Sequence, residues 1–214
     1  LGFTETNAEE RFSFYKNIYD QFLQLQTTNS KPQTSLVPHA PYTVSGKLFQ
    51  LINDASAGKV ISIHNQECAA EDELYKSKSG DFFRLLDFLK IDTSFFRASG
   101  KSSLQTYLPL LDKADNILLV HNTFTEQQDI DFCKQQSEKN GQQIFFCICA
   151  NANLYIEGRM PPFDLFRKNN CNIVLGTDSY SSNWSLSILD EMRRIQHESA
   201  FSIPTAEILK WATI

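Results

Sequence analysis

Apolar and polar residues follow one another in blocks that predict strands separated by helices. Short apolar runs rich in β-branched residues end in a histidine or an aspartate at four places, which are residues 35–39, 59–64, 116–121 and 172–178. A fifth run, residues 143–149, has similar length and ends in a cysteine. Runs of this length and composition are typical of buried strands.

Apolar residues at helical spacing fill most of the chain between these runs. The expected helices cover residues 8–26, the stretch after a cap at Ser45, residues 82–89, residues 104–111, the stretch after a cap at Thr125, residues 163–166, residues 186–195 and a last segment from near Pro204. Residues 65–79 and 150–162 are expected to be loops. Regular alternation of strands and helices predicts a parallel sheet with right-handed crossovers in a single α/β domain.

The residues that end the runs are the candidates for chemistry. In a (β/α)₈ barrel the carboxyl ends of the strands converge on one mouth, so residues far apart in the chain meet there. We therefore expect His39, His64, His121 and Asp178 to be neighbours. The fourth histidine, His197, falls in a helical pattern and is interpreted as a surface residue.

Imidazole nitrogens with a carboxylate are typical ligands of a catalytic transition metal that keeps one position open for water. Glu67, three residues after His64, lies past the strand end, where it can face a substrate. A structural interpretation stays open for each residue alone. A single strand-end histidine is more often structural, and Asp178 can cap the following helix, as Ser181 or Ser182 also can.

Composition narrows the class of protein. A net charge of −5 over 214 residues provides no basic stripe for nucleic acid, which leaves small molecules or proteins as partners. The apolar runs are shorter than the roughly 18 residues of a membrane span, so we expect no membrane contact. Five cysteines, an odd number, favour reduced thiols and a cytoplasmic location.

Four short motifs carry a resemblance to a known family. The motifs are His39-Ala40-Pro41-Tyr42-Thr43, His64-x-x-Glu67, Leu119-Val120-His121 and Leu175-Gly176-Thr177-Asp178-Ser179. With these motifs the chain resembles the amidohydrolase superfamily, in its branch of cytosine, guanine and S-adenosylhomocysteine deaminases and triazine chlorohydrolases. The resemblance runs over nearly the whole chain and implies the (β/α)₈ TIM barrel of metal-dependent hydrolases.

The resemblance implies a role for each candidate. His64 and Asp178 are the expected ligands of one divalent metal, zinc or iron, and Asp178 also takes a proton from the attacking water. Glu67 is expected to carry a proton to the substrate ring and then to the leaving group, and His121 to polarise the substrate or the water. The expected substrate contacts are His39 and Asn153, although the family's Cys-Pro-x-Ser-Asn pattern before Asn153 is broken by Ala150 and Ala152.

One family feature is absent from the sequence. The family's His-x-His pair on the first barrel strand supplies two metal ligands, and no histidine precedes His39. The chain also starts at Leu1 and stops at Ile214 within a helical pattern. We therefore expect residues 1–214 to be one incomplete barrel domain with about strands 4–8, without the first strands and the flanking β-sandwich. Such a piece should bind metal weakly or not at all, and its open sheet edges should favour a homo-oligomer.

These expectations lead to one function and its rivals. The parent protein is expected to be a metal-dependent hydrolase of a carbon–nitrogen bond, which deaminates a purine- or pyrimidine-like ring, while this piece is inactive. A chlorohydrolase or cyclic-amide hydrolase on the same scaffold is the first alternative, and a metal-free binding module is the second. The separate class of zinc deaminases with His-x-Glu and Pro-Cys-x-x-Cys ligands is excluded, because those motifs do not occur.

Overall fold

A four-stranded parallel sheet forms the centre of the chain, in a computed structural model that describes residues 4–24 and 34–213. The strands pair in chain order, and the register sets Asn65 opposite His121 and Val120 opposite Cys147. The carboxyl ends of neighbouring strands therefore lie side by side. The strands are β1 (Val60–Asn65), β2 (Asn116–His121), β3 (Gln143–Ile148) and β4 (Asn172–Leu175).

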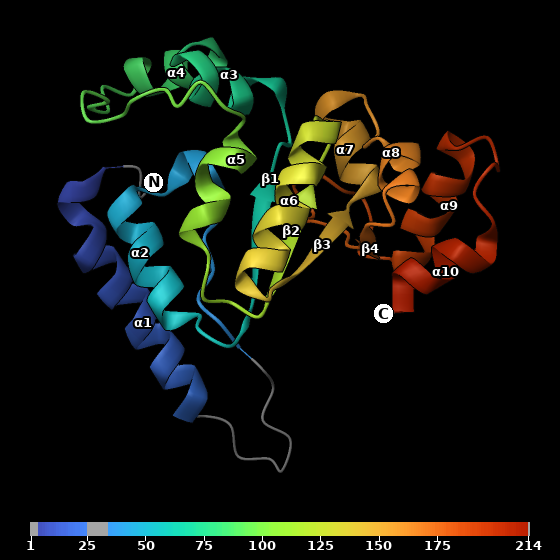
Figure 1. The fold of residues 1–214 in the computed structure, drawn as a ribbon, viewed down its shortest axis with the longest axis horizontal. Coiled ribbons are helices and arrows are strands. Elements are labelled where there is room, and N and C mark those ends of the chain that lie inside the picture. The colour runs from blue at the N-terminus through green and yellow to red at the C-terminus, as the bar shows by residue number, and fades with distance from the viewer. Residues whose placement is uncertain (1–3, 25–33, 214) are drawn as a thin grey trace.

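Helices connect the strands and pack along the sheet (Figure 1). Before the sheet come η1 (Glu5–Asn7), α1 (Ala8–Gln24), η2 (Pro41–Thr43) and α2 (Gly46–Ala55). Between β1 and β2 the chain makes a long excursion through α3 (Ala69–Ser77), α4 (Gly80–Phe88), α5 (Ser103–Tyr107) and η3 (Leu108–Leu110). The remaining helices are α6 (Gln127–Asn140), α7 (Ala150–Glu157), α8 (Phe163–Lys168), α9 (Ile188–Glu198) and α10 (Thr205–Thr213).

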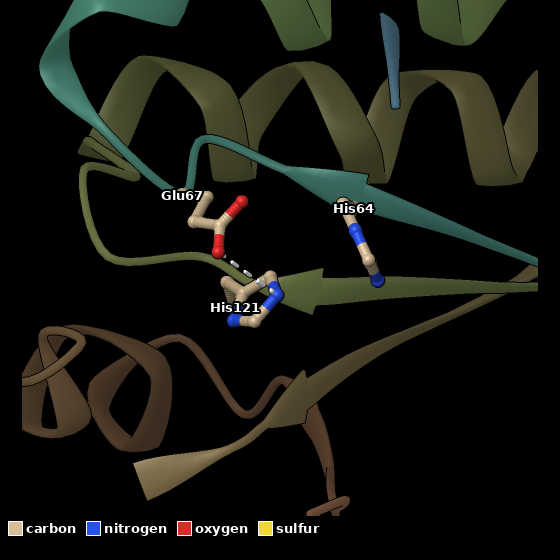
Figure 2. A group of neighbouring side chains, drawn as sticks. All are labelled: His64, Glu67 and His121. Carbon is tan, nitrogen blue, oxygen red and sulfur yellow. Dashed lines mark ion pairs between the residues drawn. The ribbon is translucent and has the colours of Figure 1, made fainter. Parts of the chain in front are cut away.

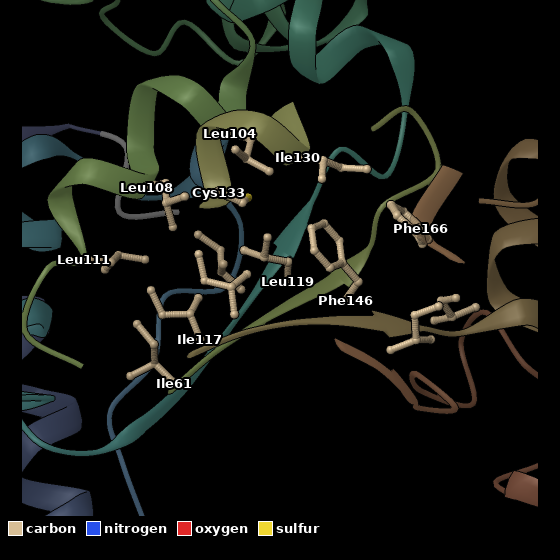
Figure 3. Close-up of a cluster of buried hydrophobic side chains, with 14 of the residues drawn as sticks. Ile61, Leu104, Leu108, Leu111, Ile117, Leu119, Ile130, Cys133, Phe146 and Phe166 are labelled. Atoms are coloured by element: carbon tan, nitrogen blue, oxygen red, sulfur yellow. The ribbon is translucent and has the colours of Figure 1, made fainter. Parts of the chain in front are cut away.

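The main hydrophobic core lies between the sheet and the helices packed against it, and it includes residues of α2, α5, α6, α8 and α10; Figure 3 shows part of it. Alternate residues of the central strands point into it, and Ile61, Ile117 and Leu119 are almost fully buried. Leu104 and Ile130 reach the same core from α5 and α6. Burial of one such aliphatic side chain contributes about 1.5–3 kcal/mol, so this core holds the strand ends in place.

The predicted strand at residues 35–39 differs from the structure. The segment is extended but is not part of the sheet. It still runs beside β1, because the His64 N–H donates to the His39 carbonyl at 3.0 Å and the Ser35 hydroxyl donates to the Val60 carbonyl. Pro38 has no N–H to donate, which shortens any regular ladder here.

Two predicted loops contain helices. Helix α3 replaces most of the loop at residues 65–79, and α7 replaces the first half of the loop at 150–162. Hydrophobic periodicity is weak in both. Helix α3 buries only Leu74 and Tyr75 among its apolar residues, and the buried start of α7 consists of alanine and asparagine. The predicted cap at Thr125 is also wrong, since Glu126 precedes the first turn of α6.

The other predicted helices are confirmed with shifted ends. Helix α1 reaches Gln24, and the last two residues of its predicted span lie outside the described residues. The strand predicted to end at Asp178 ends at Leu175. Among the residues that the structure describes, no helix is both long and apolar enough to cross a membrane.

Candidate active site

The strand ends bring the four predicted residues together. The rings of His39 and His64 lie 4.7 Å apart between centroids, and those of His64 and His121 lie 4.9 Å apart. His64 Nε2 is 4.0 Å from Asp178 Oδ1. Residues separated by up to 139 positions along the chain, from His39 to Asp178, therefore share one small space at the carboxyl edge of the sheet.

Glu67 joins this group from the turn after β1. Its Oε1 lies 3.5 Å from His121 Nε2, and Figure 2 shows its carboxylate turned toward that imidazole. One ligand atom from each of His64, Glu67 and His121 can be chosen so that all lie within 4.8 Å of one another. This trio is not the ligand pair expected from the sequence, which was His64 and Asp178.

Asn153 on α7 determines the tautomer of the His121 ring. The Asn153 amide nitrogen donates to the His121 carbonyl at 3.1 Å and to the Thr123 hydroxyl at 2.8 Å. Its oxygen therefore faces His121 Nδ1, 3.2 Å away, and accepts a hydrogen bond from the Nδ1–H. The lone pair of His121 is left on Nε2, which is buried and has no hydrogen-bond partner among the residues described.

Burial keeps both central imidazoles neutral. It lowers the pKa of His64 to about 4, with help from the neighbouring His121 and His39, and it also lowers the pKa of His121. Neutral imidazoles have the free lone pairs that a metal requires. Burial raises the pKa of Glu67, and the Asp178 carboxylate adds to the effect, which suits a group that gains and loses a proton.

Asp178 does not cap a helix. The next helix, α9, begins ten residues later with Ser187 as its cap, so Ser181 and Ser182 are not caps either. The Ser182 hydroxyl instead donates to the Asp178 carboxylate. The interpretation of Asp178 as a helix cap is therefore wrong, and its carboxylate lies beside His64.

Left-handed backbone marks the ends of three strands. Positive φ angles occur at Gln66 (45°), His121 (77°), Asn122 (59°) and Asp178 (57°). Each such residue costs on the order of 1–3 kcal/mol unless its surroundings hold it, and such strain clusters at functional sites. Two of these residues, His121 and Asp178, are sequence-predicted site residues, and Gln66 directly precedes a third, Glu67.

Comparison with known proteins agrees with this geometry. Residues 5–214 match the amidohydrolase family, and the chain belongs to that family. It is 28% identical over 211 residues to an adenosine deaminase of Helicobacter pylori, which covers 96% of this chain and 46% of the relative. The chain thus spans about half the length of the curated relatives that it matches.

Solved structures share the fold. A crystal structure of Helicobacter pylori aminofutalosine deaminase superposes with a TM-score of 0.75 at 24% identity, over 99% of this chain and 50% of that one. An adenosine deaminase from Xanthomonas campestris with bound zinc superposes with a TM-score of 0.66 at 21% identity, over 96% and 42%. Family members typically depend on a divalent metal.

The residues present fit a divalent cation. The unpartnered Nε2 of His121 and the neutral His64 offer imidazole lone pairs, and two carboxylates lie beside them. Sequence reasoning missed the residues that hold the site residues in place, notably Gln66, which is buried within the turn that carries Glu67. The polar residues after β1 were the available signal for these supporting residues. The hydrogen-bond partners of these polar residues lie on elements that are distant in the sequence, so the signal could not be interpreted.

Proposed function

We propose that the parent protein of this chain is a metal-dependent hydrolase that removes an amino group from a purine-like ring. The observation that carries the proposal is the convergence of His64, Glu67, His121 and Asp178 at one edge of a parallel sheet. Similarity to proteins named adenosine deaminase and 5-methylthioadenosine/S-adenosylhomocysteine deaminase supports an adenosine-like small-molecule substrate.

The residues take distinct parts in this proposal. One divalent cation, zinc or iron, held by His64 and Asp178 would lower the pKa of a bound water to about 7. Asp178 would take a proton from the attacking water. Glu67, whose pKa is raised by burial, carries a proton to the ring nitrogen and then to the leaving amine.

Two further residues orient the reaction. His121 faces the same space with a free lone pair on Nε2, where it can accept a hydrogen bond from water or substrate. His39 lies against His64 and is the proposed substrate contact. Asn153 is buried and uses its amide on His121 and Thr123, so we assign it to orienting His121 in addition to the predicted substrate contact.

The test uses a full-length protein that contains this chain, prepared with Zn²⁺ or Fe²⁺. Purines, pyrimidines and adenosine-like nucleosides are screened for ammonia release, and chlorinated triazines are screened for chloride release. Glu67→Gln should lower kcat about 100- to 10,000-fold while metal content stays unchanged. Glu138→Gln, on the exposed surface of α6, is the matched control and should keep full activity. Activity retained in Glu67→Gln would contradict the role of Glu67, and chloride release in place of ammonia would favour a chlorohydrolase.

We also propose that residues 1–214 form part of a larger barrel, about its strands 4–8, and that the remaining strands and the flanking β-sandwich belong to the rest of the parent. The proportion of the relatives that is covered supports this. The 214-residue chain alone should then bind metal weakly. Anomalous scattering from a fully occupied ion held by His64 and Asp178 in that chain would contradict the proposal.

Self-association of the isolated chain is a related proposal. Helix α1 exposes Phe14, Ile18 and Phe22, and a cavity of about 510 Å³ opens between α1 and residues 35–39. A second copy of the chain is the proposed cover, and light scattering that shows a monomer at high concentration would contradict it.

The five cysteines are free, which supports a reducing, cytoplasmic location.

A further inference from the structure

Gln66 occupies the corner between the last residue of β1 and Glu67. Its backbone is left-handed, with φ at 45°, although glutamine has no special tolerance for that region. The side chain is 1% exposed. A strained, buried amide next to a proposed catalytic carboxylate requires a physical explanation.

Backbone and side chain of Gln66 are both held by hydrogen bonds. Its N–H donates to Glu71 Oε1 at 2.9 Å, and its carbonyl accepts from the Phe124 N–H at 3.1 Å. Its side-chain nitrogen donates to Asp129 Oδ2 at 3.0 Å, and its side-chain oxygen accepts from the Thr125 hydroxyl at 2.8 Å. These partners come from α3, from α6 and from the turn after β2.

The two carboxyl groups that accept hydrogen bonds from Gln66 also accept hydrogen bonds from α5. Ser103 donates to Glu71 Oε1, and Ser102 donates to Asp129 Oδ1 at 2.5 Å. Gln105 donates to the same Asp129 oxygen at 2.9 Å. All three donors belong to the start of α5, so the excursion between β1 and β2 is bonded onto the corner at Gln66.

The energies favour a fixed corner. The left-handed conformation is unfavourable for glutamine, and four hydrogen bonds to the backbone and side chain of Gln66 offset that cost. The corner therefore stays in a conformation that glutamine disfavours. The next side chain along the chain is Glu67, which the corner directs at His121.

We propose that Gln66 is a positioning residue for Glu67, held in its left-handed conformation by Glu71, Asp129 and Thr125. The proposal rests on the proposed function, because it assigns Glu67 a proton-transfer role. Gln66 itself contacts neither the imidazoles nor the substrate space through any of its four hydrogen bonds.

The test compares two glycine substitutions in the full-length protein. Gln66→Gly removes the backbone strain together with both side-chain hydrogen bonds. Ala200→Gly is the matched control, because Ala200 also has a left-handed backbone, with φ at 47°, but lies exposed after α9. The measurements are kcat, KM, metal content and the crystal structure of each variant.

Gln66→Gly should lower kcat about 100-fold with KM and metal content unchanged, because misplacement of a catalytic group by about 1 Å has that effect. Its crystal structure should show Glu67 displaced from His121, and Ala200→Gly should show neither change. Wild-type kcat in Gln66→Gly, or Glu67 still in place, would overturn the proposal. Should Gln66→Gly not fold, the isosteric Thr125→Val removes one hydrogen bond and should lower kcat about threefold to tenfold, with unchanged kcat overturning the proposal.

The crystal structures separate this proposal from the proposed function. If the wild-type protein releases no ammonia from any substrate, the proposed function fails. The displacement of Glu67 in the Gln66→Gly structure is still measurable in that case. A displaced Glu67 supports the positioning role and an undisplaced one overturns it.

Discussion

The turn after β1 and helix α1 differ in how each treats its side chains. At the turn, Gln66 and Glu71 are buried polar residues, at 1% and 0% exposure, and each of their side-chain polar atoms except Glu71 Oε2 is hydrogen-bonded. In α1, the apolar Phe14, Ile18 and Phe22 are 62%, 49% and 47% exposed. Polarity alone therefore predicts neither region correctly.

The difference lies in the partners that each region has. Four elements meet at the turn and bring complementary donors and acceptors, so polar groups can be buried with little loss of hydrogen bonding. Helix α1 packs mainly on α2 and η1, and only Ala8 of its residues is buried. The described residues offer α1 no second apolar layer. Replacing a buried polar residue should therefore lower the free energy of unfolding more than replacing an exposed apolar residue of α1. Hydrophobicity alone would suggest the opposite order.

The largest effect is expected from Glu191→Ala, at a second buried polar cluster near the site. The Glu191 carboxylate accepts from the Asn151 N–H, from the Asn151 side chain and from the Asn183 side chain, at 2.7–3.0 Å. Its loss leaves three buried donors without an acceptor, which should cost about 4 kcal/mol in the free energy of unfolding. Urea denaturation measures this.

Glu198→Ala is the matched control for that prediction. Glu198 lies on the same helix, and its pairing with Arg194 is partly exposed to solvent. An exposed ion pair contributes less than about 1 kcal/mol, so the control should change stability little. Equal losses in the two variants would contradict the view that buried polar partners hold this edge of the sheet.

A smaller effect is expected from pH, through Glu71. Burial raises the pKa of Glu71 from its ordinary value of 4.5 to about 8, despite hydrogen bonds from Ser103 and Gln66. Between these two pH values the folded chain keeps a proton that the unfolded chain has lost. Stability therefore falls as pH rises, by on the order of 3 kcal/mol between pH 5 and pH 8.

The neutral variant Glu71→Gln isolates this contribution. It keeps an oxygen that can accept from the Gln66 N–H but has no proton to lose. Thermal unfolding of both proteins is measured across the pH range. His64 and the other titratable groups contribute equally to both curves, so the difference in slope between the curves is due to Glu71. Parallel curves for the wild type and Glu71→Gln would contradict the predicted shift in pKa.

The sequence predicted the parts of the fold whose signal is local. The apolar runs that became β1 to β4 are nearly uninterrupted, and a histidine or aspartate at or just past three of their ends implied a shared edge once parallel pairing was assumed. Helix α7 was missed because Ala150–Asn153 is buried all round, which leaves no helical periodicity to detect. The segment at residues 35–39 shows the reverse error, since its composition is typical of a strand and Pro38 limits its pairing.

The sequence pointed to the strand-end residues that the structure brings together, and it did not point to the residues that support them. His64, Glu67, His121 and Asp178 stand out because each follows an apolar run, and family resemblance gave them roles. Gln66 carries no such signal, because its proposed role depends on Glu71, Asp129 and Thr125, which α3, α6 and the turn after β2 bring to it. Support of this kind arises from tertiary packing and has no fixed spacing in the sequence.

The smallest effect is expected from Ile18→Ala in α1. Half of the Ile18 side chain is exposed, so little burial is lost and the free energy of unfolding should change by less than about 0.5 kcal/mol. Ile117→Ala, in the core of β2, should cost about 2–5 kcal/mol by the same measurement. If Ile18→Ala proves as costly as Ile117→Ala, α1 is covered in solution, and a concentration-dependent melting temperature would identify a second copy of the chain as the cover.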